Sequence, residues 1–163
     1  MKHISYLIIV LGLLASCTGK KSANANQVEF DSIVVNEQIK LLPDTPDSIP
    51  YAALSVHYVY PKSFREKADL KRLQQLFHEA VLGSTDGTPQ EAVNKCVANY
   101  SEIYRTENTA DFLQDKKEFP EGDISYMYMH TDDTKNTIEY VNHSLLSFSV
   151  MTDVYKGGAH GVE

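Results

Sequence analysis

Apolar residues recur along this chain with two different periods, and each period predicts a different kind of element. From Ala53 to Tyr60 every second side chain is large and apolar or aromatic, and Pro61 ends the run. This alternation predicts a strand with one buried face. Looser strand-like patterns span Val28 to Leu42, before a proline-containing loop, and Leu145 to Tyr155. We therefore predict strands in all three segments.

Two other segments follow the helical period of about 3.6 residues. In the first, Gly83 is placed to cap a helix whose apolar face consists of Leu70, Leu73, Phe77, Ala80 and Val81. The second starts with Thr88, Pro89 and Glu91, a predicted capping box that stabilises a helix by about 1 kcal/mol. Its apolar face consists of Val93, Cys96, Val97, Tyr100 and Tyr104, and the pattern fades by Asn108. We predict a loop over 109–123, with at most a short helical turn near 111–116.

The pattern after this loop predicts further strands. Ile124 to Thr131 alternates, residues 132–136 have the composition of a turn, and another strand begins at Thr137 until Asn142-His143-Ser144 interrupts it. Helices inserted between pairs of strands predict an α+β fold, with an antiparallel sheet and two helices packed on one side. We assign 28–123 to an N-terminal α+β module, and 124–163 to its final strands and the start of an incomplete second module.

The N-terminus has the pattern of an export signal. Lys2 and His3 precede an apolar run from Ile4 to Leu14, which is too short to span a bilayer because a spanning helix needs about 20 apolar residues. Leu14-Ala15-Ser16-Cys17 then matches the lipobox of bacterial lipoproteins. This match implies cleavage between Ser16 and Cys17 and acyl chains such as palmitate on Cys17. We assign 1–16 to a lipoprotein signal peptide; the alternative is an ordinary secretory signal with an incidental cysteine.

Lipidation of Cys17 would make a membrane the first partner of this chain. Three acyl chains anchor a protein essentially permanently, whereas one chain gives marginal binding. Residues 17–27 continue as a small, polar and therefore flexible tether, whose reach is at most about 30 Å. Because Thr18 rather than an aspartate follows the cysteine, we expect an outer-membrane anchor that faces the periplasm, if the cell has two membranes.

The charge balance and the cysteines limit other chemistry. Lys and Arg number 15 against 22 Asp and Glu, and this net charge of -7 argues against a nucleic-acid partner. Lipidation of Cys17 leaves Cys96 as the remaining cysteine, so no intramolecular disulfide is expected. Cys96 lies on the apolar face of the second predicted helix, which favours a structural thiol over a nucleophile.

No catalytic constellation is apparent in the sequence. The chain lacks a Gly-x-Ser-x-Gly motif. The histidines after the leader are scattered over predicted strands, a helix and loops, at His57, His78, His130, His143 and His160. We therefore predict no catalytic residue, no metal site and no cofactor. An alternative from another class is a metal-dependent envelope hydrolase or deacetylase that uses His130, Asp132 and Asp133, although this segment is more typical of a solvated turn.

The end of the chain carries its most specific motif. Tyr155-Lys156-Gly157-Gly158-Ala159-His160-Gly161, after the strand Leu145 to Val154, resembles the Tyr-x-Gly-Gly-Ala-His motif of RsiV-like and PdaC-like domains. The resemblance extends over Phe30 to Gly161. Its candidate site residues are Tyr155, Gly157, Gly158, Ala159, His160 and Gly161. In that family the motif opens a domain-sized C-terminal module, so we expect a shortened second module in a chain that stops at Glu163.

The resemblance implies binding rather than catalysis. The family's activity is mainly protein binding, including the sensing of lysozyme by its anti-sigma members, and its deacetylase chemistry belongs to a separate catalytic domain. We therefore expect a membrane-anchored, non-enzymatic binding domain of the cell envelope. Its expected ligand is a peptidoglycan fragment, a lysozyme-like protein or another envelope protein. The alternatives are the metal-dependent enzyme and a nonfunctional fragment of a longer lipoprotein.

Overall fold

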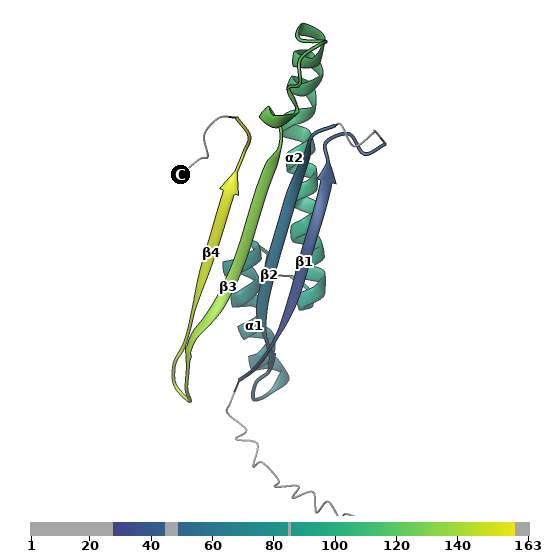
Figure 1. The fold of residues 1–163 in the computed structure, drawn as a ribbon. Coiled ribbons are helices and arrows are strands. Elements are labelled where there is room, and N and C mark those ends of the chain that lie inside the picture. Colours follow the sequence, from purple (N-terminus) through teal and green to yellow (C-terminus); the bar gives the residue numbers. More distant parts are fainter. Residues whose placement is uncertain (1–27, 45–48, 85, 159–163) are drawn as a thin grey trace, which may run out of the picture.

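The computed structural model describes residues 28–44, 49–84 and 86–158 of the chain (Figure 1). The elements follow in the order β1 (Glu29–Lys40), β2 (Tyr51–Ser63), α1 (Lys67–Leu82), α2 (Pro89–Glu118), the 3-10 helix η1 (Ser125–Met127), β3 (His130–Val141) and β4 (Leu146–Tyr155). The signal peptide, the lipobox with Cys17, the tether, and Ala159, His160 and Gly161 lie outside the described residues. Within these ranges, no helix has both the length and the apolar character needed to cross a membrane.

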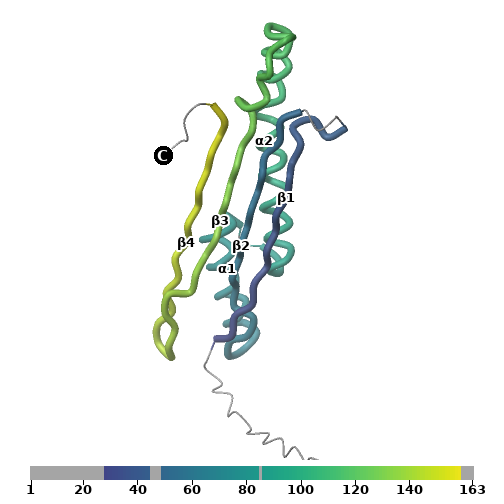
Figure 2. The backbone as a smooth tube through the Cα atoms, in the orientation of Figure 1, coloured from purple at the N-terminus to yellow at the C-terminus, as the bar shows by residue number. Residues whose placement is uncertain are grey.

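The described strands form one four-stranded sheet in the order β1-β2-β3-β4, and both helices cover the same face of it (Figures 1 and 2). The predicted α+β fold with two helices on one side is confirmed. The sheet is mixed rather than wholly antiparallel, because β2 pairs with β3 in parallel while the two outer pairings are antiparallel. The chain between β2 and β3 contains both helices and returns to the end of the sheet where β2 began, so β3 starts beside Ala52.

The helix starts and stops follow the local signals in the sequence. The side chain of Thr88 accepts a hydrogen bond from the backbone N–H of Glu91, whose carboxylate in turn accepts from the backbone N–H of Thr88, so the predicted capping box is present. Gly83 ends α1 in the left-handed conformation, at a φ of 64°. The predicted loop over 109–123 is wrong, however, because α2 continues to Glu118. Its last turns project beyond the strands (Figure 1), and a helix with no sheet to cover loses the apolar stripe by which it is predicted.

The predictions for 124–136 are wrong except at His130 and Thr131, which lie in a strand as predicted. The strand predicted over Ile124 to Thr131 is η1 followed by the start of β3, and the turn predicted at 132–136 lies inside β3. Asn136 explains part of this error, because it is a polar residue that is only 2% exposed. Its side-chain amide donates to the carbonyl of Val59 and accepts from the N–H of Val59, both at 2.8 Å. The amide thus continues the pairing of β2 with β3 just beyond the last parallel pair, His57 with Lys135.

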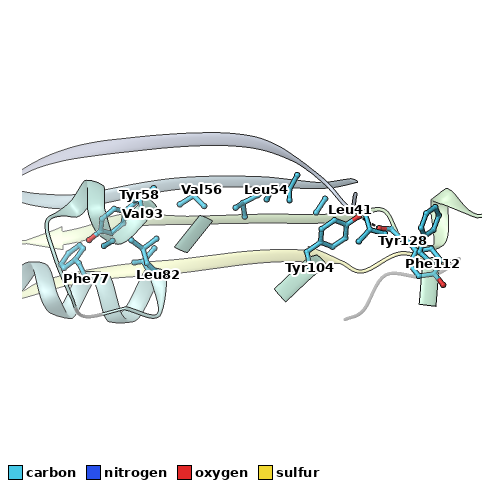
Figure 3. Close-up of a cluster of buried hydrophobic side chains, with 14 of the residues drawn as sticks. Leu41, Leu54, Val56, Tyr58, Phe77, Leu82, Val93, Tyr104, Phe112 and Tyr128 are labelled. Carbon is cyan, nitrogen blue, oxygen red and sulfur yellow. Dashed lines mark hydrogen bonds between the residues drawn. The ribbon is translucent and has the colours of Figure 1, made fainter. Parts of the chain in front are cut away.

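The core runs along the length of the sheet, between its inner face and the two helices (Figure 3). Alternate residues of β2 supply its floor, which is why the pattern from Ala53 to Tyr60 predicted that strand well: Ala52, Leu54, Val56 and Tyr58 are all buried. At one end Phe77 of α1 stacks on Phe148 of β4, with ring centroids 4.3 Å apart. At the other end Phe112 of α2 meets Tyr128 edge to face, at 5.4 Å.

His78 is a polar side chain inside this core. It is 0% exposed, its ring lies 5.8 Å from that of Tyr58, and neither imidazole nitrogen has a hydrogen-bond partner in the described structure. Burial lowers the pKa of His78. Burial, with a contribution from Lys156, also lowers the pKa of His130, against an opposing effect of Glu107. The folded protein therefore holds both imidazoles neutral at pH values where the unfolded chain would take up protons.

We expect the free energy of unfolding to fall as the pH drops below about 6.5, the ordinary pKa of histidine. Above that pH, the two imidazoles are neutral in both the folded and the unfolded state, so they do not lower the free energy of unfolding. Below it, each histidine lowers the free energy of unfolding by up to about 1.4 kcal/mol per pH unit. Urea unfolding at pH 7.5, 6.5 and 5.5 measures the slope. His78→Leu should flatten it, whereas the neighbouring core variant Phe77→Leu should lower stability equally at all three values. An unchanged slope in His78→Leu would remove His78 as its source.

Candidate functional site

The Gly-Gly motif predicted as a candidate site forms a closed turn at the end of β4. The Tyr155 hydroxyl donates a short hydrogen bond to the carbonyl of Gly158 and so ties the turn to itself. Gly157 and Gly158 adopt φ values of 86° and 85°, in the left-handed region that favours glycine. The structure therefore brings Tyr155, Gly157 and Gly158 together, while Ala159, His160 and Gly161 lie outside the described residues.

Gly157 packs directly against the backbone at the end of η1. A Cβ atom on this residue would lie 2.1 Å from the carbonyl oxygen of Met127 and 2.7 Å from its carbonyl carbon. The same construction at Gly158 meets nothing within 4 Å. The first glycine of the motif is therefore required for a close approach between β4 and the segment 119–129.

Two tyrosines fasten that segment to α2. The hydroxyl of Tyr104 donates to the carbonyl of Tyr128 at 2.8 Å, and the hydroxyl of Tyr128 donates to Asp115 Oδ2 at 2.6 Å. Burial and the Asp115 carboxylate raise the pKa of Tyr128 to about 12, so its hydroxyl remains a donor at all physiological pH values. The end of β4, η1 and the last turns of α2 thus form one braced unit, which we call the motif end of the domain.

The motif end contains a cleft of about 500 Å³. The cleft lies between the last turns of α2, the segment 119–129 and the start of β2. The residues that line it are Ile49, Pro50, Tyr51, Phe112, Lys116, Glu121, Gly122, Asp123, Ser125 and Met129. The ammonium of Lys116 donates to the carbonyl of Gly122 at 3.3 Å, and Asp123 Oδ1 accepts from the N–H of Ser125 at 3.1 Å. These hydrogen bonds fix the loop between α2 and η1. The Glu121 carboxylate, in contrast, has no hydrogen-bond or ion-pair partner among the described residues. The cleft therefore combines an apolar lining with an available negative charge.

Large apolar side chains are exposed on the segments that line this cleft. Leu113 is 43% exposed, Phe119 55%, Tyr126 56% and Met127 43%. The chain from 111 to 123 also carries five carboxylates against two lysines, a local charge of -3: Asp111, Asp115, Glu118, Glu121 and Asp123 against Lys116 and Lys117. Exposed aromatic and methionine side chains around a cleft are typical of protein-binding surfaces. The motif end therefore combines exposed apolar side chains with a local excess of negative charge.

Cys96 is a half-buried thiol of α2, near the Asp132 carboxylate of β3. Burial and the nearby Asp132 carboxylate raise the pKa of the Cys96 thiol, and the same two causes raise the pKa of Tyr100 to about 12. Burial likewise raises the pKa of Asp132, although Thr134 donates a hydrogen bond to it at 3.2 Å. A nucleophilic cysteine needs the opposite environment, one that lowers its pKa. The arrangement is that of a packed thiol.

The three residues of the metal-site alternative do not converge. His130 and Asp132 alternate along β3 on the side that faces the helices, where His130 meets the ring of Tyr104 at 5.0 Å. Asp133 follows Asp132 directly along β3, so its side chain points to the other side of the sheet. Within the described ranges, no group of three or more His, Cys, Asp or Glu side chains could hold a metal ion.

The cleft was missed by sequence reasoning. It forms between residues near positions 50, 115 and 125, and no local pattern shows that these meet. A usable signal was present in Phe119, an aromatic residue next to Pro120 in a segment otherwise rich in charge. Such an isolated aromatic residue outside a periodic pattern favours an exposed contact over a core position.

Comparisons with known proteins place this fold beside one solved structure. No protein-family model matches the chain, and no curated protein matches it. A crystal structure of a member of the DUF3298 family from Bacteroides fragilis is similar, with a TM-score of 0.75, 27% sequence identity, and coverage of 85% of this chain and 54% of that one. The chain thus spans about half the length of that protein. It shares its fold with a member of the DUF3298 family.

Proposed function

We propose that this chain is a lipid-anchored protein of the RsiV-like and PdaC-like type, whose folded domain binds an envelope protein without catalysing a reaction. The observation that carries the binding role is the motif end: a cleft of about 500 Å³ with exposed aromatic and apolar side chains on the segments that line it. The similarity to a DUF3298 protein supports the family assignment, because RsiV-like and PdaC-like proteins contain DUF3298 domains.

The charge of the motif end favours a basic protein as the partner. A local excess of carboxylates attracts a positively charged surface and speeds its association. Phe119 and Tyr126 would then supply the buried contacts that dominate the binding energy of protein interfaces. A lysozyme-like protein fits this description, since it combines a basic surface with access to the cell wall. A peptidoglycan fragment would use less of this surface.

The position of the proposed anchor suits this role. Glu29 begins β1 at the end of the sheet opposite the cleft, and β1 leads to the loop that precedes Ile49 (Figure 1). A strand of 12 residues spans about 40 Å. If Cys17 carries lipid, the tether joins the domain at the end of the sheet opposite the cleft, which leaves the motif end accessible to partners in the envelope.

One experiment tests both parts of the proposal. Membrane vesicles from cells that produce the chain should capture purified lysozyme, and Cys17→Ala should remove capture by the vesicles while the purified chain keeps its affinity. The double variant Phe119→Ala/Tyr126→Ala should weaken lysozyme binding at least tenfold in both settings, because exposed aromatic anchors contribute more than 1.4 kcal/mol where they are central.

The matched control is Leu76→Ala/Ile103→Ala, which removes two side chains that are 61% and 56% exposed on the helices away from the cleft. This control should bind lysozyme as the unaltered chain does. Equal weakening in both double variants would exclude the motif end as the binding surface. Capture that survives Cys17→Ala in the vesicles would contradict the lipid anchor.

A further inference from the structure

The turn between β3 and β4, residues 140–146, is exposed and apolar, and we call it the hairpin tip. It contains no Asp, Glu, Lys or Arg, although charged residues make up 23% of the chain. The pairing of the two strands ends with Val141 opposite Leu146, and Leu145 lies in the turn. Tyr140 is 51% exposed, Val141 37% and Leu145 57%. Because water covers these side chains, their transfer to an apolar environment is favourable.

Asn142 satisfies polar backbone groups of the hairpin tip from inside the turn. Its Oδ1 accepts from the backbone N–H groups of Ser144 and Leu145, both at 2.8 Å. Its own N–H donates to the carbonyl of Leu145 at 2.9 Å, and its Nδ2 donates to the Tyr140 hydroxyl at 2.8 Å. A turn leaves water at low cost only when such groups have partners, because an unpaired polar group is strongly unfavourable in an apolar medium. These three N–H groups do not depend on water.

The hairpin tip lies at the end of the sheet where β1 begins (Figure 1). Glu29, the first residue of β1, pairs with Ser63 of β2. Ser63 and Val141 each lie six residues beyond the last parallel pair, His57 with Lys135, so β2 and β3 end at the same level. The chain that would carry lipid therefore enters the domain at the same end as the hairpin tip, opposite the cleft of the motif end.

We propose that the hairpin tip inserts into the surface of a lipid bilayer, a contact that rests on the proposed function because the anchor brings the membrane near. The Tyr140 ring suits the level of the headgroups, and Val141 and Leu145 suit the boundary of the acyl chains. The tip has no charged side chain that must lose its water at pH 7. The motif end, in contrast, has a local charge of -3 over residues 111–123, which anionic headgroups repel.

The size of the hairpin tip favours a membrane over a protein as its partner. A stable protein interface covers about 800 Å² on each partner, which three exposed side chains on one turn do not provide. A weak contact suffices on a membrane, because the tether keeps the tip close to the anchor and so at a high local concentration. With both the tether and the tip on the bilayer, β1, whose 12 residues span about 40 Å, holds the cleft away from the membrane.

A single tryptophan tests this contact, because the chain has no tryptophan of its own. A hexahistidine tag in place of residues 1–17 tethers the chain to vesicles of phosphatidylethanolamine, phosphatidylglycerol and a nickel-chelating lipid. In Leu145→Trp the emission should shift to the blue and be quenched by brominated acyl chains. In Ile103→Trp, at a position of α2 that is 56% exposed, neither change should occur.

Two results of the tryptophan experiment would overturn the proposal. Emission from Leu145→Trp that is the same in water and on the vesicles would refute insertion of the hairpin tip. Quenching of both Leu145→Trp and Ile103→Trp would mean that the domain lies with its helices on the membrane.

Variants without tryptophan measure what the hairpin tip contributes to membrane attachment. In imidazole, the tagged variant Val141→Thr/Leu145→Asn should leave the vesicles about fivefold faster than the unaltered tagged chain, because it loses its second attachment. The matched control Val34→Thr/Leu76→Asn makes the same changes at side chains that are 59% and 61% exposed, and it should leave at the unaltered rate. Equal rates for the two double variants would contradict the proposal. If circular dichroism shows that the tip variant is unfolded, Leu145→Asn alone replaces it, with about twofold faster release expected.

The tag separates this proposal from the lipid anchor and from protein binding. Because the chelating lipid replaces the acyl chains, the result does not depend on lipidation of Cys17, which the vesicle capture experiment tests by itself. In solution, Val141→Thr/Leu145→Asn should bind lysozyme with the affinity of the unaltered chain. A loss of that affinity would contradict a hairpin tip that contacts lipid alone.

Discussion

Replacing Gly157 with alanine is expected to lower the free energy of unfolding by about 3 kcal/mol or more. The added Cβ would lie 2.1 Å from the carbonyl oxygen of Met127, a backbone atom that cannot rotate away. The positive φ of 86° adds a conformational cost of about 1–2 kcal/mol for any L side chain. Either the glycine turn after β4 or the segment 119–129 must move. The hydrogen bond from the Tyr155 hydroxyl to the Gly158 carbonyl should then break, and the shape of the cleft should change.

Gly158→Ala is the matched control for this contact. Its φ of 85° is nearly the same, but nothing lies within 4 Å of its Cβ position. It should therefore show the conformational cost alone, about 1–2 kcal/mol. Urea unfolding of the purified variants, followed by circular dichroism, measures both values. Equal losses in the two variants would mean that β4 does not approach Met127 as closely as described.

The substitution Asn136→Ala is expected to lower the free energy of unfolding by about 3 kcal/mol. The substitution removes two hydrogen bonds and leaves the N–H and the carbonyl of Val59 without partners beside the core. Each unsatisfied buried backbone group costs about 1–3 kcal/mol, which is more than the bond contributes when it is made. Thr137→Ala, one position along the same strand on its exposed face, should change stability by less than about 0.5 kcal/mol.

Hydrogen exchange provides a second measurement for Asn136. The amide proton of Val59 should exchange much faster in Asn136→Ala than in the unaltered chain, because Asn136 Oδ1 is its acceptor. The amides of β1 and the first half of β2 should be less affected. A loss below about 1 kcal/mol with unchanged exchange at Val59 would show that water replaces the amide without cost.

The sequence was a good guide where a structure depends on neighbours in the chain. The capping box at Thr88 and the left-handed residue Gly83 were predicted because a cap is built from residues within one turn of each other. The strand predicted from Ala53 to Tyr60 lies inside β2, because one face of β2 is buried along most of its length.

The errors have a common physical cause in residues whose burial depends on distant partners. Residues 132–136 inside β3 were predicted as a turn, because the outward positions there are polar and the buried Asn136 is satisfied by Val59, 77 residues earlier in the chain. The end of α2 was predicted as a loop because its last turns leave the sheet. The Gly-Gly motif was found from its residue types, but its contact with Met127 joins positions 30 residues apart and could not be seen in the sequence.

The parallel pairing of β2 with β3 divides the sheet into two hairpins that meet along one seam. The first hairpin has 12 paired positions and the second has 10, whereas the seam pairs only Ala52–His57 with His130–Lys135. Strand pairs distant in sequence form late, since both helices must be placed before the seam can close. The second hairpin should therefore be the last unit to join during folding and the first to detach in partial unfolding. The two hydrogen bonds between the Asn136 side chain and the backbone of Val59 stabilise the end of the seam against this detachment. If the chain is exported in an unfolded state, this domain could finish folding only after β4 had crossed the membrane.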